Sequence, residues 1–138
     1  MCPNPGAPCA PGFSLTFPPD PAWVRTCRET VRTSTTARSE LTDLAVLLTS
    51  ESVSNAITAS ADSGCRHPIS LFGEWVPDGS FRVHVRDGAP GVPVVQQPAL
   101  TDVHGRGMYL VANWASRWGV CIDGPGPGKS FWFQLGCG

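Results

Sequence analysis

The sequence predicts an α/β two-layer sandwich of the α+β type, in which helices cover one face of a mixed, mostly antiparallel sheet. Two stretches in the first half have apolar residues at helical spacing. Two strand-like runs then follow, joined by the short turn 77–80, which is the pattern of an antiparallel hairpin. With 138 residues, the chain is long enough for one domain with a core, and too short for two.

Composition and charge exclude several classes of protein. Apolar residues make up 41% of the chain and charged residues only 15%, which favours a folded domain over disorder. The formal net charge is −1 and no run of Lys or Arg occurs, so we expect no nucleic-acid partner. No apolar run approaches the ~18 residues of a membrane span, and the N-terminus lacks the pattern of a signal peptide. We therefore expect a cytoplasmic protein.

The cysteines do not form a metal-binding pattern. No two of them stand at C-x₂₋₄-C spacing, and the three histidines do not complete a zinc pattern. We expect reduced thiols, several of them buried as small apolar side chains. The six cysteines are Cys2, Cys9, Cys27, Cys65, Cys121 and Cys137.

The N-terminal part divides into a tail and the start of the domain. Residues 1–12 are rich in proline and predict a flexible tail, so the domain is expected over 13–138. Residues 13–17 have the pattern of an edge strand. Asp20 and Pro21 predict the N-cap and first residue of a helix. That helix has apolar residues at i, i+3 and i+7, namely Val24, Cys27 and Val31.

A second helix is expected from Ser39 or Glu40 to about Ser60, ending before Ser63-Gly64. After it, strand-like runs cover 69–76, 81–86, 119–123 and 130–135, and a further helix is expected over 105–118. A long proline-bearing loop over 88–104 has the length typical of a lid.

The second helix carries two polar residues on a face that should be buried or half-buried. Its apolar stripe includes Leu44 and Leu48, and helical spacing continues that stripe to Glu51 and Asn55. A carboxylate and a carboxamide four residues apart share one side of a helix. Because polar pairs are common on helices, the pair taken alone favours a structural role, and its inward direction raises the functional interpretation to about even.

Three short segments occur in an order that suggests a nucleotide site: 51–55, 87–91 and 105–107. Each is weak by itself. A carboxylate such as Asp87 at the end of a strand often caps a turn, and glycine before a helix is ordinary. A fourth segment, 124–130, ends in Gly-Lys-Ser but is not a P-loop. Asp123 stands where that motif needs glycine, and a strand follows where it needs a helix.

Taken together, these segments resemble the N, G1 and G2 boxes of the GHKL ATPase/kinase superfamily. Within this superfamily, the chain resembles the small anti-sigma-factor serine/threonine kinases of Gram-positive bacteria, particularly those of actinobacteria. The resemblance covers about residues 13–135 and rests on Asp20-Pro21, Ser50–Ala56, Val85–Gly91, Gly105–Val111 and Gly128–Phe133. It implies the histidine-kinase-ATPase type of sandwich, with ATP and Mg²⁺ bound between helix and sheet.

The resemblance implies a role for each matching residue. Glu51 would act as general base, Asn55 would hold Mg²⁺, and Asp87 would accept the exocyclic amine of adenine. The base and phosphate contacts would come from Gly91, Gly105, Arg106, Gly107 and Ser130. Gly91 would let the backbone pass the adenine, Gly105 and Gly107 would present N–H groups to the phosphates, and Arg106 would reach the γ-phosphate. Ser130 would touch the adenine, directly or through water.

The implied function is phosphoryl transfer from MgATP to Ser or Thr of an anti-sigma-factor antagonist, together with sequestration of a sigma factor. The implied partners are therefore two proteins, and the oligomeric state stays open, with a homodimer as one option. The alternative is a nucleotide-gated binding module without kinase activity. A domain that binds no nucleotide would leave the joint spacing of the three segments unexplained.

Overall fold

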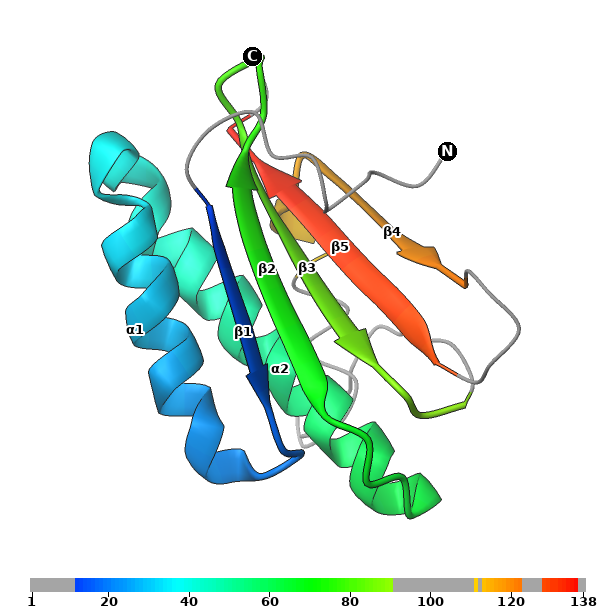
Figure 1. The fold of residues 1–138 in the computed structure, drawn as a ribbon. Coiled ribbons are helices and arrows are strands. Elements are labelled where there is room, and N and C mark those ends of the chain that lie inside the picture. The colour runs from blue at the N-terminus through cyan, green and yellow to red at the C-terminus, as the bar shows by residue number, and fades with distance from the viewer. Residues whose placement is uncertain (1–11, 91–110, 112, 123–127, 137–138) are drawn as a thin grey trace.

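The computed structural model describes residues 12–90, 111, 113–122 and 128–136. Within them the chain forms strand β1, helices α1 and α2, and strands β2 to β5 (Figure 1). Their bounds are β1 Phe13–Phe17, α1 Val24–Ser34, α2 Thr42–Ser63, β2 Ile69–Trp75, β3 Phe81–Asp87, β4 Arg117–Cys121 and β5 Lys129–Leu135. The predicted tail 1–12 lies outside these residues except for Gly12.

The five strands form one sheet in the order β1-β2-β3-β5-β4. Every pairing among the described strands is antiparallel, which corrects the expectation of a mixed sheet. The reason lies between β1 and β2. Two helices in series return the chain to the end of the sheet where β1 stopped, so β2 runs back beside it (Figure 1).

The fold is α+β with two layers, because α1 and α2 lie on the same face of the sheet (Figure 1). Strand side chains alternate between faces, and the apolar set of each strand is directed at the helices. From the strands this core takes Phe17, Ile69, Leu71, Phe81, Val83, Val85, Phe131, Phe133 and Leu135. From the helices it takes Cys27, Val31, Ala45, Val46, Leu48, Val53, Ala56 and Ile57. We call the side facing the helices the inner face and the opposite side the outer face.

The helix ends follow the predicted signals with two adjustments. Asp20 caps as expected, since its Oδ1 accepts the N–H of Ala22 at 2.9 Å, but the first turn is a 3-10 helix at Pro21–Trp23. Helix α2 begins at Thr42, later than predicted, because a 3-10 segment precedes it. It ends before Gly64, whose φ of 70° is the left-handed conformation that glycine adopts readily.

The prediction of a helix as far as residue 118 is wrong at its end. Trp118 lies in β4, with its side chain on the inner face opposite Phe133. Its ring meets that of Phe131 edge-on, with centroids 6.1 Å apart. The N–H of Ala115 still donates to the carbonyl of Val111, which is a helical hydrogen bond. Most of the predicted helix lies outside the described residues.

The expectation that all cysteines are reduced is also wrong. Cys121, at the end of β4, is disulfide-bonded, whereas Cys27 and Cys65 are free. Burial raises the pKa of the Cys27 thiol to about 11. Disulfides are rare in a reducing compartment, so the cysteines give no support to a cytoplasmic location. In the described part of the chain, no helix has both the length and the apolar character to cross a bilayer.

Candidate functional site

Helix α2 carries Glu51 and Asn55 at half-buried positions, as the sequence predicts. Between them, Ser52 and Val53 are buried, and the hydroxyl of Ser52 donates to the carbonyl of Leu48 at 2.7 Å. The two candidate residues therefore lie at the border of the packed face rather than in it. Side chains at such half-buried positions are still accessible to a ligand.

Asp87 is the last residue of β3 and is buried, with 5% of its surface exposed. It continues the inward set of Val83 and Val85, so its carboxylate lies on the inner face. Its Oδ1 accepts the N–H of Ala89 at 2.9 Å and the ammonium of Lys129, also at 2.9 Å. The same ammonium group donates to the carbonyl of Ala89 at 3.3 Å. Asp87 and Lys129 thus form a buried ion pair that holds both polar groups of the Ala89 backbone.

Lys129 is a site residue that sequence reasoning missed. It pairs directly with Asp87 across β3 and β5, and its side chain is 5% exposed. The signal was present in the alternation of β5, because Lys129 precedes the inward residues Phe131, Phe133 and Leu135 at intervals of two.

The same alternation places Ser130 on the outer face, where it pairs with Arg86. The structure thus brings Lys129, and not Ser130, to Asp87. The contact of Ser130 with adenine stays a prediction.

Two glycines shape the backbone around Asp87. A Cβ on Gly88 would lie 2.9 Å from the Cβ of His67 and 3.2 Å from the sulfur of Cys65. Gly128 has a φ of +117°, and a Cβ there would lie 2.6 Å from the carbonyl oxygen of Asp87. The strand end is therefore packed between the segment that follows α2 and the start of β5, which places Asp87 near the C-terminal end of α2.

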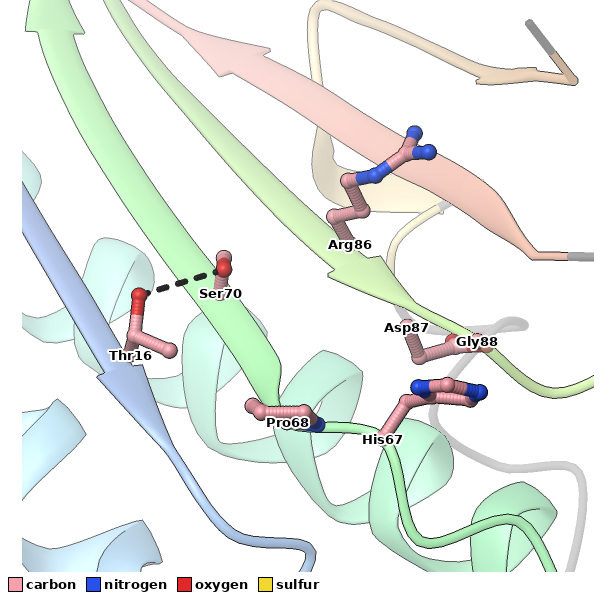
Figure 2. A pocket seen from close by; sticks show the side chains of 7 residues that line it. All are labelled: Thr16, His67, Pro68, Ser70, Arg86, Asp87 and Gly88. Carbon is pink, nitrogen blue, oxygen red and sulfur yellow. Dashed lines mark hydrogen bonds between the residues drawn. The ribbon is translucent and has the colours of Figure 1, made fainter. Parts of the chain in front are cut away.

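A groove of about 410 Å³ opens on the outer side of this strand end (Figure 2). It is lined by Thr16, His67, Pro68, Ser70, Arg86, Asp87 and Gly88. The hydroxyl oxygens of Thr16 and Ser70 are 3.3 Å apart, and Arg86 is exposed beside them. Figure 2 shows the helices behind the sheet, so the groove is on the face opposite α2. It is therefore not the space between helix and sheet where the resemblance places ATP.

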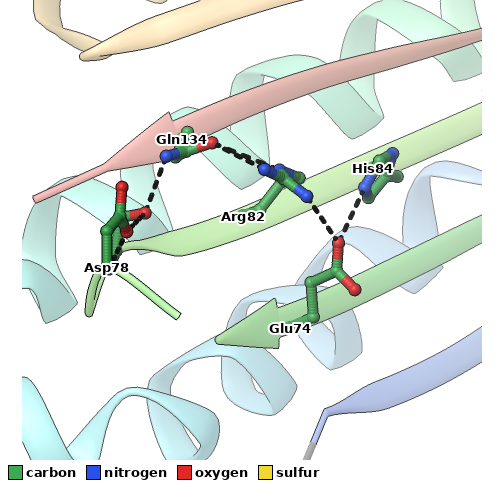
Figure 3. Close-up of polar contacts among 6 residues, drawn as sticks. Glu74, Asp78, Arg82, His84 and Gln134 are labelled. Carbon is green, nitrogen blue, oxygen red and sulfur yellow. Dashed lines mark hydrogen bonds and ion pairs between the residues drawn. The ribbon is translucent and has the colours of Figure 1, made fainter. Parts of the chain in front are cut away.

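A second group of buried polar residues lies on the outer face, nearer the β2–β3 turn (Figure 3). One oxygen of Glu74 lies 3.2 Å from the guanidinium of Arg82 and 3.4 Å from Nε2 of His84. Arg82 also donates twice to the side-chain carbonyl of Gln134, at 3.1 and 3.2 Å. The amide of Gln134 then donates to the hydroxyl of Ser80 at 2.7 Å. We call Glu74, Ser80, Arg82, His84 and Gln134 the outer-face network.

Burial dominates the electrostatics of His84 in this network. It lowers the pKa of His84, and the repulsion of the Arg82 charge acts in the same direction. The hydrogen bond and the charge of Glu74 oppose that shift without overcoming it. Sequence reasoning missed this network as well. Its polar residues alternate with the core residues of β2, β3 and β5, and this alternation is the sequence signal that could have indicated it.

Four predicted site residues lie outside the described residues: Gly91, Gly105, Arg106 and Gly107. The described residues also contain no cluster of three His, Cys, Asp or Glu side chains that could hold a metal ion. Mg²⁺ bound with a nucleotide needs few protein ligands, since phosphates and waters supply the others. A single ligand such as Asn55 therefore fits that chemistry.

No protein-family model matches this chain, and a search of curated proteins finds no match.

Proposed function

We propose that this protein binds MgATP and transfers the γ-phosphate to Ser or Thr of a small protein antagonist, while sequestering a sigma factor. The observation that carries the proposal is the carboxylate of Asp87. It is buried at the end of β3, on the sheet face that packs against α2, and α2 carries Glu51 and Asn55. A buried carboxylate beside the helix with a candidate base and metal ligand is the arrangement that the GHKL resemblance requires.

Asp87, Asn55 and Glu51 would each have a different role at the nucleotide. Asp87 would accept a hydrogen bond from the amine of adenine, which selects the base. Asn55 would supply an amide oxygen to the Mg²⁺ that accompanies the nucleotide. Glu51 lies one helical turn from Asn55 on the same side of α2 and would take the proton of the acceptor hydroxyl. As it does so, the hydroxyl oxygen would attack the γ-phosphorus, and ADP would leave. This assignment makes phosphoryl transfer depend on Glu51, and ATP affinity depend on Asp87.

The test combines nucleotide binding with phosphate transfer. Calorimetric titration with MgATP should show binding in the micromolar range, and MgATP should raise the melting temperature. Labelled phosphate should pass to a co-purifying antagonist. Glu51→Ala should lower that transfer by ~10²–10⁴-fold and leave ATP affinity within a few-fold. Asp62→Ala is the matched control, an exposed carboxylate on the same helix.

Three results would decide against this function. Wild type that binds no nucleotide contradicts the whole proposal. If wild type binds MgATP but phosphorylates no co-purifying protein, the alternative function, a nucleotide-gated binding module without kinase activity, replaces the proposed one. Transfer at the wild-type rate by Glu51→Ala removes Glu51 from the reaction.

A further inference from the structure

The groove on the outer face takes no part in the proposed nucleotide site, because it lies on the side of the sheet away from α2 (Figure 2). Three of its lining residues form one row across three neighbouring strands. Thr16 of β1 pairs with Ser70 of β2, and Ser70 pairs with Arg86 of β3. Residues directly opposite each other in antiparallel strands have Cβ atoms roughly 4.5–5.5 Å apart. Two hydroxyls and a guanidinium therefore lie side by side in this row.

Arg86 is exposed, and among the described residues it takes part in no ion pair. Arg82, four residues earlier on the same face, pairs with Glu74 and donates to Gln134. Figure 2 shows the side chain of Arg86 extended outward from β3. Because exposed side chains change rotamer within nanoseconds, its guanidinium can turn toward an anion bound in the groove.

The hydroxyls of Thr16 and Ser70 supply a further donor beside this cation. Their oxygens are 3.3 Å apart, and either hydroxyl can donate to the other. Two hydroxyls have two protons, and their mutual hydrogen bond uses one of them. The second proton can be donated to a ligand in the groove that both side chains line.

A second wall of the groove comes from the segment that joins α2 to β2. His67 and Pro68 line the groove there, and both are exposed. Gly88 lets this segment approach the end of β3, because a Cβ at residue 88 would lie 2.9 Å from the Cβ of His67. The imidazole of His67 has an N–H donor in either neutral tautomer, and the ring of Pro68 provides an apolar surface.

The groove therefore combines several donors with a cation. Asp87 is the one carboxylate among the described residues that line it, and Asp87 pairs with Lys129 at 2.9 Å on the inner face. We propose that this groove binds a phosphate group, either free or as the monoester of a small molecule. Arg86 would contact it through two N–H groups, whose fork geometry matches phosphate oxygens. The hydroxyl pair of Thr16 and Ser70 would donate to another oxygen of the same group.

The size of the groove favours an ester over the free ion. Its volume of about 410 Å³ lies within the range of roughly 300–1,000 Å³ that is typical of small-molecule sites. One phosphate ion would fill only part of that space, and the carbon part of an ester would lie against Pro68. This site goes beyond the proposed function and does not depend on it, because the groove and α2 lie on opposite faces of the sheet.

The experiment titrates the protein with inorganic phosphate, glycerol phosphate and glycerol, in chloride buffer at constant ionic strength. Amide chemical shifts measured by NMR give the dissociation constants and the place of binding. Wild type should bind both phosphate compounds and not glycerol. The largest shifts should occur at Thr16, Ser70 and Arg86. Tighter binding of glycerol phosphate would identify an ester as the ligand, and tighter or equal binding of inorganic phosphate would identify the free ion.

Variants then test the individual donors. Arg86→Met should weaken the binding of both phosphate compounds by about tenfold or more, because it removes charge-assisted hydrogen bonds. Thr16→Val keeps the shape of the side chain without its hydroxyl and should weaken binding by roughly two- to tenfold. Arg28→Met is the matched control, because Arg28 is an exposed arginine on α1, on the other side of the sheet. It should leave the dissociation constants unchanged.

Two results would overturn the proposal. If neither phosphate compound shifts the amides of the groove in wild type, the groove is not a phosphate site, and this result requires no variant to fold. If Arg86→Met binds phosphate as tightly as wild type, or the largest shifts lie on α2, the phosphate is bound elsewhere. Neither result bears on the proposed function, since MgATP binding is measured separately.

Discussion

Strand β3 has buried polar groups on both faces, and the two sets are built differently. On the outer face, Arg82 and His84 belong to a network that also joins residues of β2 and β5. On the inner face, Asp87 pairs with Lys129; Asp87 accepts the N–H of Ala89, and Lys129 donates to the carbonyl of Ala89. The outer-face network connects three strands, whereas the inner pair holds the turn at which β3 ends.

This difference separates a structural role from a site. Arg82 bridges two side chains from the two neighbouring strands, so a shift in strand register would break several contacts at once. Asp87 lies where the strand leaves the sheet, and its Oδ1 accepts the N–H of Ala89 and the ammonium of Lys129. We therefore expect substitutions in the outer-face network to change stability alone, and substitutions around Asp87 to change ligand binding as well as stability.

The largest effect should come from Glu74→Ala. This variant leaves Arg82 without its carboxylate partner in a largely buried position, where losing one member of an ion pair costs about 3–5 kcal/mol. Urea denaturation measures the loss. Glu40→Ala is the control, because its pair with Arg38 is solvent-exposed and should add nothing measurable. Equal stability of the two variants would show that the network does not hold the strands together.

Asp87→Asn tests the inner side of the comparison. The variant can no longer accept the adenine amine as a charged group, so ATP affinity should fall by roughly 1–3 kcal/mol. The variant also leaves the ammonium of Lys129 buried without a charged partner, so it should lose stability as well. Calorimetry with MgATP gives the affinity, and Asp62→Asn on the exposed side of α2 serves as control. Unchanged ATP affinity would show that Asp87 does not bind the adenine base.

Asn55→Ala is a second test of the proposed nucleotide site on the inner face. If Asn55 holds Mg²⁺, the variant should lose the part of ATP affinity that depends on Mg²⁺, about tenfold or 1–1.5 kcal/mol. Titrations with and without Mg²⁺ measure this part. Ser54→Ala is the neighbouring half-buried control. A purely structural Asn55 would instead show lower stability with the same dependence on Mg²⁺.

The smallest effect concerns His84 and pH. Its folded-state pKa is lowered from the ordinary value of about 6.5, mainly by burial. Below about pH 6.5, His84 therefore takes up a proton more readily in the unfolded chain than in the folded protein. The free energy of unfolding falls as the pH falls. One such group contributes a slope of at most ~1.4 kcal/mol per pH unit.

Urea denaturation at several pH values between 7 and 5 measures the slope. His84→Gln, which cannot titrate but can still donate to Glu74, should reduce it. His67→Gln, at an exposed position, should leave it unchanged. Equal slopes for wild type and His84→Gln would assign the acid sensitivity to other groups.

Local sequence signals determined most of the elements. The capping role of Asp20 and the end of α2 at Gly64 follow from hydrogen bonding and backbone conformation within a few residues. The half-buried positions of Glu51 and Asn55 follow from helical periodicity. These features need only short-range physics, so the sequence alone was sufficient for them.

Tertiary structure decided what depends on strand pairing. Trp118 joined β4 because pairing with β5 places its ring against Phe131, and no pattern around residue 118 encodes that contact. The register between β3 and β5 brought Lys129 to Asp87 and directed Ser130 to the other face. A shift of one residue would exchange the two. The amino-acid sequence thus marked Asp87 as a candidate, and the pairing of two strands distant in sequence supplied its partner.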